Sequence, residues 1–329
     1  MSTGSKPRTT GSPLALLFLS LCTASTGSAG ATFAFVTNQG DNTVSVIDLK
    51  AMTVVATIAV GTSPAGVAVS PDGARVYVTS PESRELHMLD GTTFQVLQHR
   101  QVGAGPLGVA VSPDGERVYV ADWYQDAVYV LETRGLTQLA RIPVGDSPSG
   151  LAVSPGGDRL YVSERDDDSI AVIDTGQNRV LARVQVGRRP FGLQVDGAGK
   201  RLYVANVASN DLSVVDVDAL PLRVTATIPV GSTPYGVAVT PDGARAFVTN
   251  QHANTVSVID TASQTVVMER EVGEFPEGIV VGPGGEAIYV ANWFGNEMVV
   301  LDTASLEIIG QIPTGESPRA FGVFIAGGT

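Results

Sequence analysis

A dipeptide, Val-Gly, recurs along this chain at an almost constant interval. It stands at 60–61, 102–103, 144–145, 186–187, 230–231 and 272–273, and a Thr-Gly variant follows at 314–315. The successive spacings are 42, 42, 42, 44, 42 and 42 residues. A repeat of this length that contains four short apolar runs is typical of one blade of a β-propeller. The seven copies therefore predict an all-β fold, a seven-bladed β-propeller with four-stranded antiparallel blades.

Turn signals separate the apolar runs inside each repeat. Pro-Asp-Gly occurs at 71–73, 113–115 and 241–243, and Pro-Gly-Gly replaces it at 155–157 and 283–285. Proline presets φ, aspartate bonds to nearby backbone, and glycine accepts a positive φ. We expect these tripeptides to be hairpin turns between the first and second strands of a blade. Short strands at regular spacing exclude helical repeats and βαβ sheets.

The two ends of the repeat region are incomplete copies of the repeat. Residues 33–38 read as a second strand with no first strand before it, and residues 318–323 read as a first strand with no second strand after it. Pairing the two would complete one blade and leave no open sheet edge. The sequence thus predicts a propeller over residues 32–329 that is closed by pairing the C-terminal strand with the N-terminal strands.

The first 31 residues lie outside the repeat. Lys6 and Arg8 form a basic start, residues 14–21 are mostly apolar, and small residues lead to an A-x-A-like site that ends at Ala31. This pattern indicates a cleaved secretory signal peptide, so we expect a periplasmic or secreted protein. The alternative is a lipoprotein attached through Cys22, although the residue before it is larger than that pattern requires. Neither the apolar run nor any later segment is long enough to make a convincing transmembrane span.

Composition excludes several kinds of chemistry. Cys22 is the single cysteine, so cleavage after Ala31 would leave none. A chain without cysteine forms no disulfide, thiolate centre, iron–sulfur cluster or covalently attached c-type haem. The leader holds two of the 21 Lys+Arg residues and none of the 33 Asp+Glu residues, so its removal makes the net charge more negative than the −12 of the full chain. An acidic surface repels phosphate backbones, and nucleic acid is not an expected partner.

The second strands carry a recurring tetrapeptide. It reads FVTN at 35–38 and 247–250, YVTS at 77–80, and YVAN at 203–206 and 289–292. These segments resemble the motif of the YVTN β-propeller repeat family, and the likeness covers the whole repeat region. That family is similar to archaeal surface-layer propellers and exported bacterial propellers. More distantly it resembles the propellers of quinoprotein amine dehydrogenases, haem-binding proteins and seven-bladed lactonases. The resemblance implies the fold but no single activity, and Asp122 and Glu164 depart from the motif at its last position.

One loop position in each repeat, directly after the loop proline, should ring the mouth of the axial channel. Around the ring it reads Ala65, Leu107, Ser149, Phe191, Tyr235, Glu277 and Arg319. The last four form one arc of aromatic and charged residues, which is typical of ligand and partner sites. With neighbouring loops included, the candidate binding residues are Arg188, Arg189, Phe191, Tyr235, His252, Glu277, Trp293, Phe294 and Arg319. The structural alternative is that Trp293 caps a blade and that Glu277 and Arg319 form a weak rim ion pair.

Three functions fit these features. The leading one is an exported, non-catalytic propeller that binds a partner protein or a small ligand at the channel mouth. The second is a lactonase-like hydrolase, with His252 or Glu277 as general base and Arg319 stabilising the oxyanion. The third is a structural protein of the cell envelope or surface.

No metal or other cofactor is expected. The three histidines, His87, His99 and His252, are too few for a histidine-rich metal cage. No nucleophile–base–acid set stands out either, so the leading function assigns no catalytic residue, and we expect a monomer.

Overall fold

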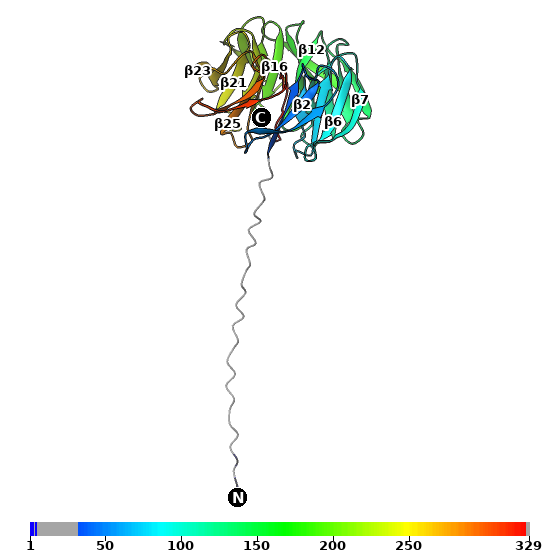
Figure 1. Ribbon diagram of the computed structural model, residues 1–329, viewed down its shortest axis with the longest axis vertical. Helices are drawn as coiled ribbons and strands as arrows, with labels where there is room; N and C mark the ends of the chain where they lie inside the picture. The colour runs from blue at the N-terminus through cyan, green and yellow to red at the C-terminus, as the bar shows by residue number, and fades with distance from the viewer. Residues whose placement is uncertain (3, 5–31, 327–329) are drawn as a thin grey trace. The chain divides into compact units, whose positions relative to one another are not determined.

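The computed structural model describes residues 1, 2, 4 and 32–326. The signal peptide predicted for residues 1–31, including Cys22 and the cleavage site, therefore lies almost wholly outside the described residues. Residues 32–326 form seven antiparallel sheets around one axis (Figure 1), six of four strands and one of three. The seven-bladed propeller predicted from the repeat is confirmed. Within the described ranges, no helix is long and apolar enough to cross a bilayer.

Each blade runs from an innermost strand at the axis to an outermost strand at the rim. The innermost strands are β4 (Val67–Val69), β8 (Pro106–Val111), β12 (Pro148–Val153), β16 (Pro190–Val195), β20 (Pro234–Val239) and β24 (Pro276–Val281). The second strands are β1 (Phe33–Asn38), β5 (Arg75–Ser80), β9 (Arg117–Asp122), β13 (Arg159–Glu164), β17 (Arg201–Asn206), β21 (Arg245–Asn250) and β25 (Ala287–Asn292).

The outer half of each blade consists of a third and a fourth strand. The third strands are β2 (Thr43–Asp48), β6 (Glu85–Asp90), β10 (Ala127–Glu132), β14 (Ser169–Asp174), β18 (Asp211–Asp216), β22 (Thr255–Asp260) and β26 (Glu297–Asp302). The fourth strands are β3 (Thr53–Ala59), β7 (Val96–Gln101), β11 (Gln138–Pro143), β15 (Arg179–Gln185), β19 (Arg223–Pro229), β23 (Thr265–Glu271) and β27 (Ile308–Pro313). Blade 1 contains β1–β3, blade 2 contains β4–β7, and the numbering continues to blade 7 with β24–β27.

The innermost strands approach one another closely because a glycine in each strand, or directly before it in β4, faces the next blade. A Cβ added at Gly108 would lie 1.9 Å from the carbonyl oxygen of Ser149, and one at Gly192 would lie 2.1 Å from that of Tyr235. Both distances are far below any contact that a real side chain could make. The small residues of the first strand are therefore required by the convergence of the blades at the axis.

The C-terminal segment completes blade 1. The amide of Phe35 donates to the carbonyl oxygen of Phe324 over 2.9 Å, and Ala34 pairs antiparallel with Ile325. The side chains of Phe324 and Ile325 are fully buried. In Figure 1 this segment, in red, lies beside the blue first strands. The predicted closure is confirmed.

The same segment also pairs with blade 2, which the sequence analysis did not predict. The amide of Val67 donates to Phe321 over 3.0 Å, and the amide of Val69 donates to Val323 over 2.9 Å. The bridge between Gly66 and Phe321 is parallel. The C-terminal segment therefore joins the first two blades as well as completing one of them.

Asparagine side chains fix the loops on the mouth face. Asn42 has a φ of 58°, and its Oδ1 accepts a 2.8 Å hydrogen bond from the amide of Ser63. Asn254 has a φ of 59° and accepts from the amide of Phe275 over 2.9 Å. Each asparagine thus turns its own loop and binds the loop that leads into the next blade.

Candidate functional site

The apolar members of the predicted ring pack on one another. The ring centroids of Phe191 and Tyr235 are 4.2 Å apart, and Phe321 from the C-terminal segment lies 4.8 Å from Phe191. These side chains are at most 9% exposed, as are those of Ala65 and Leu107 in the same cluster. This buried cluster includes four of the predicted ring positions together with Phe321, and we call it the plug.

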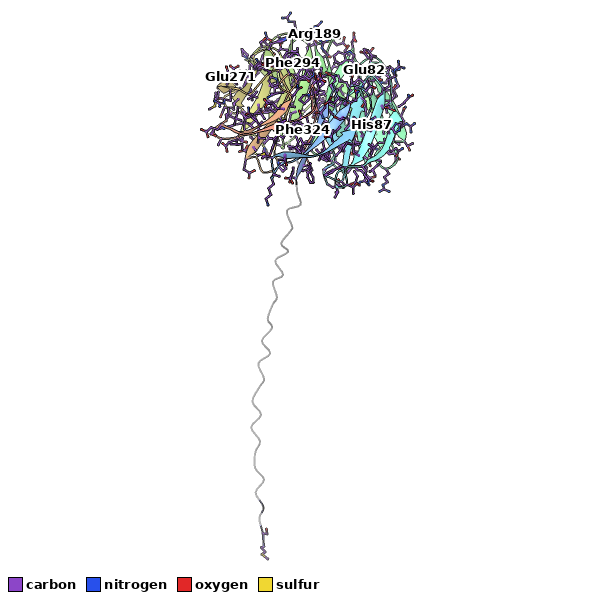
Figure 2. All side chains as sticks on the ribbon, in the orientation of Figure 1. Glu82, His87, Arg189, Glu271, Phe294 and Phe324 are labelled. Atoms are coloured by element: carbon purple, nitrogen blue, oxygen red, sulfur yellow. The ribbon has the colours of Figure 1, made fainter. Side chains whose placement is uncertain are left out.

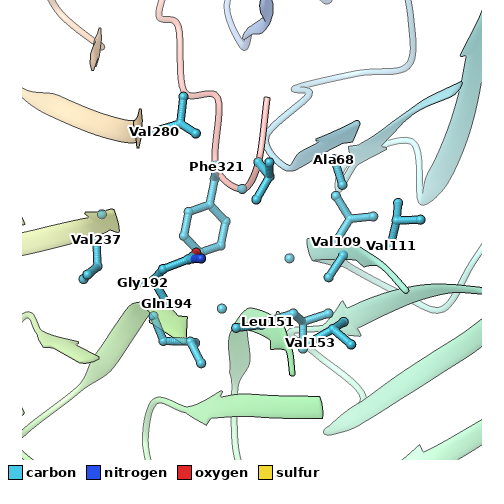
Figure 3. A pocket seen from close by; sticks show the side chains of 18 of the residues that line it. Ala68, Val109, Val111, Leu151, Val153, Gly192, Gln194, Val237, Val280 and Phe321 are labelled. Atoms are coloured by element: carbon cyan, nitrogen blue, oxygen red, sulfur yellow. The ribbon is translucent and has the colours of Figure 1, made fainter. Parts of the chain in front are cut away.

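A cavity of about 290 Å³ lies along the axis between the innermost strands. Its lining is aliphatic apart from Phe321, and Gln194 is the one polar side chain among the described residues that line it. The Gln194 amide donates to the carbonyl oxygen of Val195 over 3.3 Å. Figure 3 shows the ring of Phe321 projecting into this cavity, with Val237 and Leu151 nearby. The cavity therefore offers a small, apolar space with few polar groups.

A buried ion pair lies at the edge of the plug. The Nε of Arg319 donates to Oε2 of Glu277 over 2.6 Å, and its Nη2 donates to the hydroxyl of Tyr235. The amide of Gln251 donates to Oε1 of Glu277 over 2.8 Å. The side chain of Glu277 is 2% exposed and that of Arg319 is 18% exposed. This pair is therefore withdrawn from solvent, unlike a weak ion pair on an exposed rim.

Burial is the largest single influence on the pKa of each of the three ionisable groups in this network. It raises the pKa of Glu277, whereas the Arg319 guanidinium and the Gln251 amide oppose that rise. Burial also raises the pKa of Tyr235 well above its usual range. For Arg319, burial acts to lower the pKa, but Glu277 and Tyr235 together outweigh it and the pKa is raised. The three contacts to the Glu277 oxygens are all made by N–H donors, which is the arrangement of an ionised pair.

Three aromatic residues form an accessible surface beside the plug, which we call the aromatic shelf: Phe275, Trp293 and Phe294. The rings of Trp293 and Phe294 stack with centroids 4.8 Å apart, and Phe275 lies 4.9 Å from Phe294. Phe294 is 58% exposed. The Cζ of Arg319 lies 5.9 Å from the ring of Trp293, so the ion pair and the shelf are adjacent.

The other predicted residues lie on the same face but are less closely joined. His252 is exposed and packs edge-on against Phe275 at 5.2 Å. Arg188 and Arg189 are also exposed, and Arg189 lies 3.7 Å from Asp166. In Figure 2 the labelled Arg189 and Phe294 both lie in the upper part of the propeller.

The geometry brings only two of the three candidate catalytic residues together. Glu277 and Arg319 are in direct contact, whereas the Nδ1 of His252 is hydrogen-bonded to the hydroxyl of Thr233 over 2.5 Å. In residues 32–326 no hydrogen bond joins His252 to Glu277 or Arg319. His252 is therefore not assembled as a general base beside Arg319, whereas Glu277, the other candidate base, is in contact with that arginine.

Sequence reasoning missed Phe275, Phe321 and Gln251. Phe275 precedes the loop proline at a position that is small or polar in all six other loops, so comparing that position would have found it. Phe321 and Gln251 carry no such signal, because their roles follow from three-dimensional packing. Trp123 lies 6.2 Å from Phe191 and packs against the plug.

Comparison with known proteins identifies the family. The family model described as a YNCE-like beta-propeller matches residues 26–114 and 194–284, together more than half of the chain. The chain belongs to the YNCE-like β-propeller family. A second model, described as a seven-bladed beta-propeller lactonase, matches residues 102–227 of this YNCE-like propeller. That match ends before His252, Glu277 and Arg319. No protein with a curated description matches the sequence.

Solved structures similar to this YNCE-like propeller include proteins with different descriptions. Hydrazine synthase from Kuenenia stuttgartiensis is 24% identical with a TM-score of 0.75, over 84% of this chain and 94% of that one. A Lactobacillus plantarum protein is 18% identical with a TM-score of 0.77, over 90% and 99%. The dihydro-heme d1 dehydrogenase NirN, in complex with DHE, is 17% identical with a TM-score of 0.67, over 87% and 74%. At these identities the likeness shows the fold alone.

Proposed function

We propose that this chain is an exported, non-catalytic propeller that binds a partner protein or a small ligand at the channel mouth. The bound group contacts the aromatic shelf of Phe275, Trp293 and Phe294, with Arg319 behind it. The observation that carries the proposal is the exposed ring of Phe294, which stacks on the half-buried Trp293 beside a plug of buried aromatic rings. Clustered exposed aromatic residues are typical of binding sites.

Two features argue against a purely structural role for the shelf. The Nε1 of Trp293 is buried without a hydrogen-bond partner, whereas a buried tryptophan in a structural setting usually pairs this group. Phe294 leaves more than half of its surface in water, so it contributes little to the stability of its blade. Ring faces of this kind favour an apolar or aromatic group on the ligand.

Tryptophan fluorescence offers a direct test. Trp123 and Trp293 are the two tryptophans, so a Trp123→Phe variant leaves Trp293 as the single reporter of the shelf. The variant is titrated with a library of aromatic and apolar small molecules and with an envelope protein extract fractionated by size. Binding at the shelf is expected to change the emission of Trp293 in a saturable way.

A matched pair of variants separates the shelf from the rest of the surface. Phe294→Ser removes an exposed ring at the mouth, and Ile309→Ser removes an equally exposed side chain on β27. Phe294→Ser is expected to abolish the titration seen with the Trp293 reporter, and Ile309→Ser to leave it unchanged. Equal effects of the two variants would refute the shelf as the binding site.

The lactonase-like hydrolase is the alternative, supported by the family model that matches residues 102–227. It predicts lactone hydrolysis that is lost in Glu277→Gln and in His252→Gln. The binding function predicts no hydrolysis by the wild-type protein above the uncatalysed rate. A turnover that disappears in either variant, measured at a temperature at which that variant is still folded, would favour the enzyme.

A further inference from the structure

A cluster of side chains that could ligate a metal lies in blade 2, apart from the residues of the channel mouth. Glu85 and His87 are on β6, and His99 on β7 is directly opposite His87 in the strand register. Oε1 of Glu85 lies 3.0 Å from Nδ1 of His99, and its Oε2 lies 3.7 Å from Nε2 of His87. One ligand atom from each of the three residues lies within 4.8 Å of the other two. The two imidazole rings face each other at 5.4 Å with an angle of 13°.

This constellation differs from the same positions in other blades. In blade 1 the motif residue Asn38 donates from its Nδ2 to Thr43 and Ser45 over 2.9 Å each. In blade 6 Asn250 makes the same two bonds, to Thr255 and Ser257. An asparagine amide that donates to two hydroxyl groups therefore recurs at these positions in blades 1 and 6, although the Oδ1 of Asn250 has no hydrogen-bond partner.

Blade 2 lacks that network. Its motif residue is Ser80, which is too short to bridge, and the positions of the two hydroxyl groups hold Glu85 and His87. The hydroxyl of Ser80 and the Nδ1 of His87 are both buried without a hydrogen-bond partner, and His87 is 6% exposed. Buried polar atoms are rarely left unpaired in a finished structural network. The cluster is thus incomplete as a set of hydrogen bonds.

We propose that Glu85, His87 and His99 bind a zinc ion. Two imidazoles and one carboxylate are a donor set that zinc takes when its fourth position stays open to water. Magnesium and calcium prefer sites made of oxygen atoms, so the two imidazoles select against them. His87 is a buried anchor, whereas the side chain of His99 is 61% exposed and leaves an entry path for the ion.

The distances between the three ligand atoms are close to those of a tetrahedral zinc site, so only a small movement of the side chains is needed to bind the ion. Bonds of about 2.0–2.2 Å in a tetrahedral site place the donor atoms about 3.3 Å apart. Glu85 and His99 are already that close, and the widest pair of ligand atoms is within 4.8 Å. Rotation of the exposed His99 ring provides the remaining movement without disturbing the buried strand β6.

Ser80 is expected to support the site indirectly. A histidine that ligates a metal through one ring nitrogen needs a partner for the N–H on the other. The Ser80 hydroxyl is unpaired and stands at the position from which Asn38 and Asn250 reach the counterparts of His87. Ser80→Ala is therefore expected to weaken zinc binding less than loss of a ligand does.

Zinc titration of the untagged chain tests the proposal. Isothermal titration calorimetry is expected to give one zinc ion per chain, and an excess of Mg²⁺ is expected not to compete. Glu85→Thr, His87→Ser and His99→Thr each copy blade 1 at the same position, and each is expected to weaken binding by at least about 10–100-fold. His252→Thr removes the remaining histidine and is expected to leave zinc binding unchanged.

A quadruple variant tests whether a loss of zinc binding results from misfolding instead of from loss of the ligands. Ser80→Asn, Glu85→Thr, His87→Ser and His99→Thr together rebuild the blade 1 network in blade 2. This variant is expected to melt no lower than the wild-type protein and to lose the zinc ion. Retention of zinc at the wild-type stoichiometry and affinity would overturn the proposal, as would the absence of saturable uptake by the wild-type chain at micromolar zinc.

Discussion

Arg319 donates from its Nε to Oε2 of Glu277 over 2.6 Å, and this bond crosses the seam of the propeller. Glu277 belongs to β24 of blade 7, whereas Arg319 lies in the C-terminal segment that completes blade 1. The backbone follows the same route, because the amide of Gly278 donates to the carbonyl oxygen of Arg319 over 3.0 Å. The ion pair thus serves ring closure and also places a charge next to the aromatic shelf.

Breaking this pair on one side is expected to destabilise the protein. Glu277→Gln leaves the Arg319 guanidinium buried without a counter-ion, and the loss is expected to be about 3 kcal/mol, at the lower end for buried pairs because Arg319 keeps some exposure. Arg319→Met likewise leaves the Glu277 carboxylate buried without a counter-ion. Urea unfolding at neutral pH measures both. The double variant is expected to lose clearly less than the two single losses together, and strict additivity would contradict the pairing.

The C-terminal segment is expected to contribute to global stability through its buried side chains. Phe324 is 0% exposed, and Phe324→Ala is expected to cost about 3–5 kcal/mol through lost burial and the cavity left behind. Phe294→Ala offers a matched control, since that ring is 58% exposed and the change is expected to stay within about 0.5 kcal/mol. Differential scanning calorimetry compares the two melts. Equal melting temperatures would show that the segment does not hold the ring closed.

Asn42 is expected to stabilise its loop in two separable ways. Its φ of 58° is unfavourable for a residue with a Cβ, and its Oδ1 accepts a hydrogen bond from Ser63. Asn42→Ala loses the bond and keeps the strain, and is expected to cost about 1–2 kcal/mol. Asn42→Gly loses the bond but relieves the strain, so its midpoint of urea unfolding should lie between those of the wild-type protein and Asn42→Ala. The reverse order would mean that the positive φ at this position does not reduce the stability of the alanine variant.

The number of blades and the closure followed from the sequence because they depend on backbone periodicity. The recurring Val-Gly loops and Pro-Asp-Gly turns set the spacing of the strands. The incomplete repeats at residues 33–38 and 318–323 likewise indicated their pairing. Each of these features is local, so it can be read without knowing where side chains point.

The details of the site depended on packing that the sequence does not encode in a simple pattern. Phe321 enters the mouth from the C-terminal segment, which also pairs with blade 2, and it turns the predicted ring into a plug. Counting histidines suggested no metal, yet strand register places His87 opposite His99. That register includes a shift between Met88 and Leu89, which spacing along the chain does not reveal.

The Pro-Asp-Gly turns contain carboxylates whose protonation is coupled to folding. In blade 2 the hydroxyl of Ser70 donates to Asp72 over 2.6 Å, and the amide of Ala74 donates to the same oxygen over 3.0 Å. These hydrogen bonds, that of Ser70 first, lower the pKa of Asp72 below its ordinary value of 3.8. The corresponding hydroxyl groups lower the pKa of Asp114 and of Asp242 in the same way.

The triple variant Asp72→Asn, Asp114→Asn and Asp242→Asn is expected to reduce the dependence of the free energy of unfolding on pH in the acid range. A carboxylate with a depressed pKa in the folded state stabilises the protein above pH 3.8, and this contribution is lost as the pH falls through the folded pKa. The wild-type protein should therefore be the more stable of the two at pH 6, and the difference should shrink below pH 3.8. Urea unfolding between pH 6 and about pH 2.5 measures it. A difference that stays constant over this range would mean that the turn carboxylates do not titrate with folding.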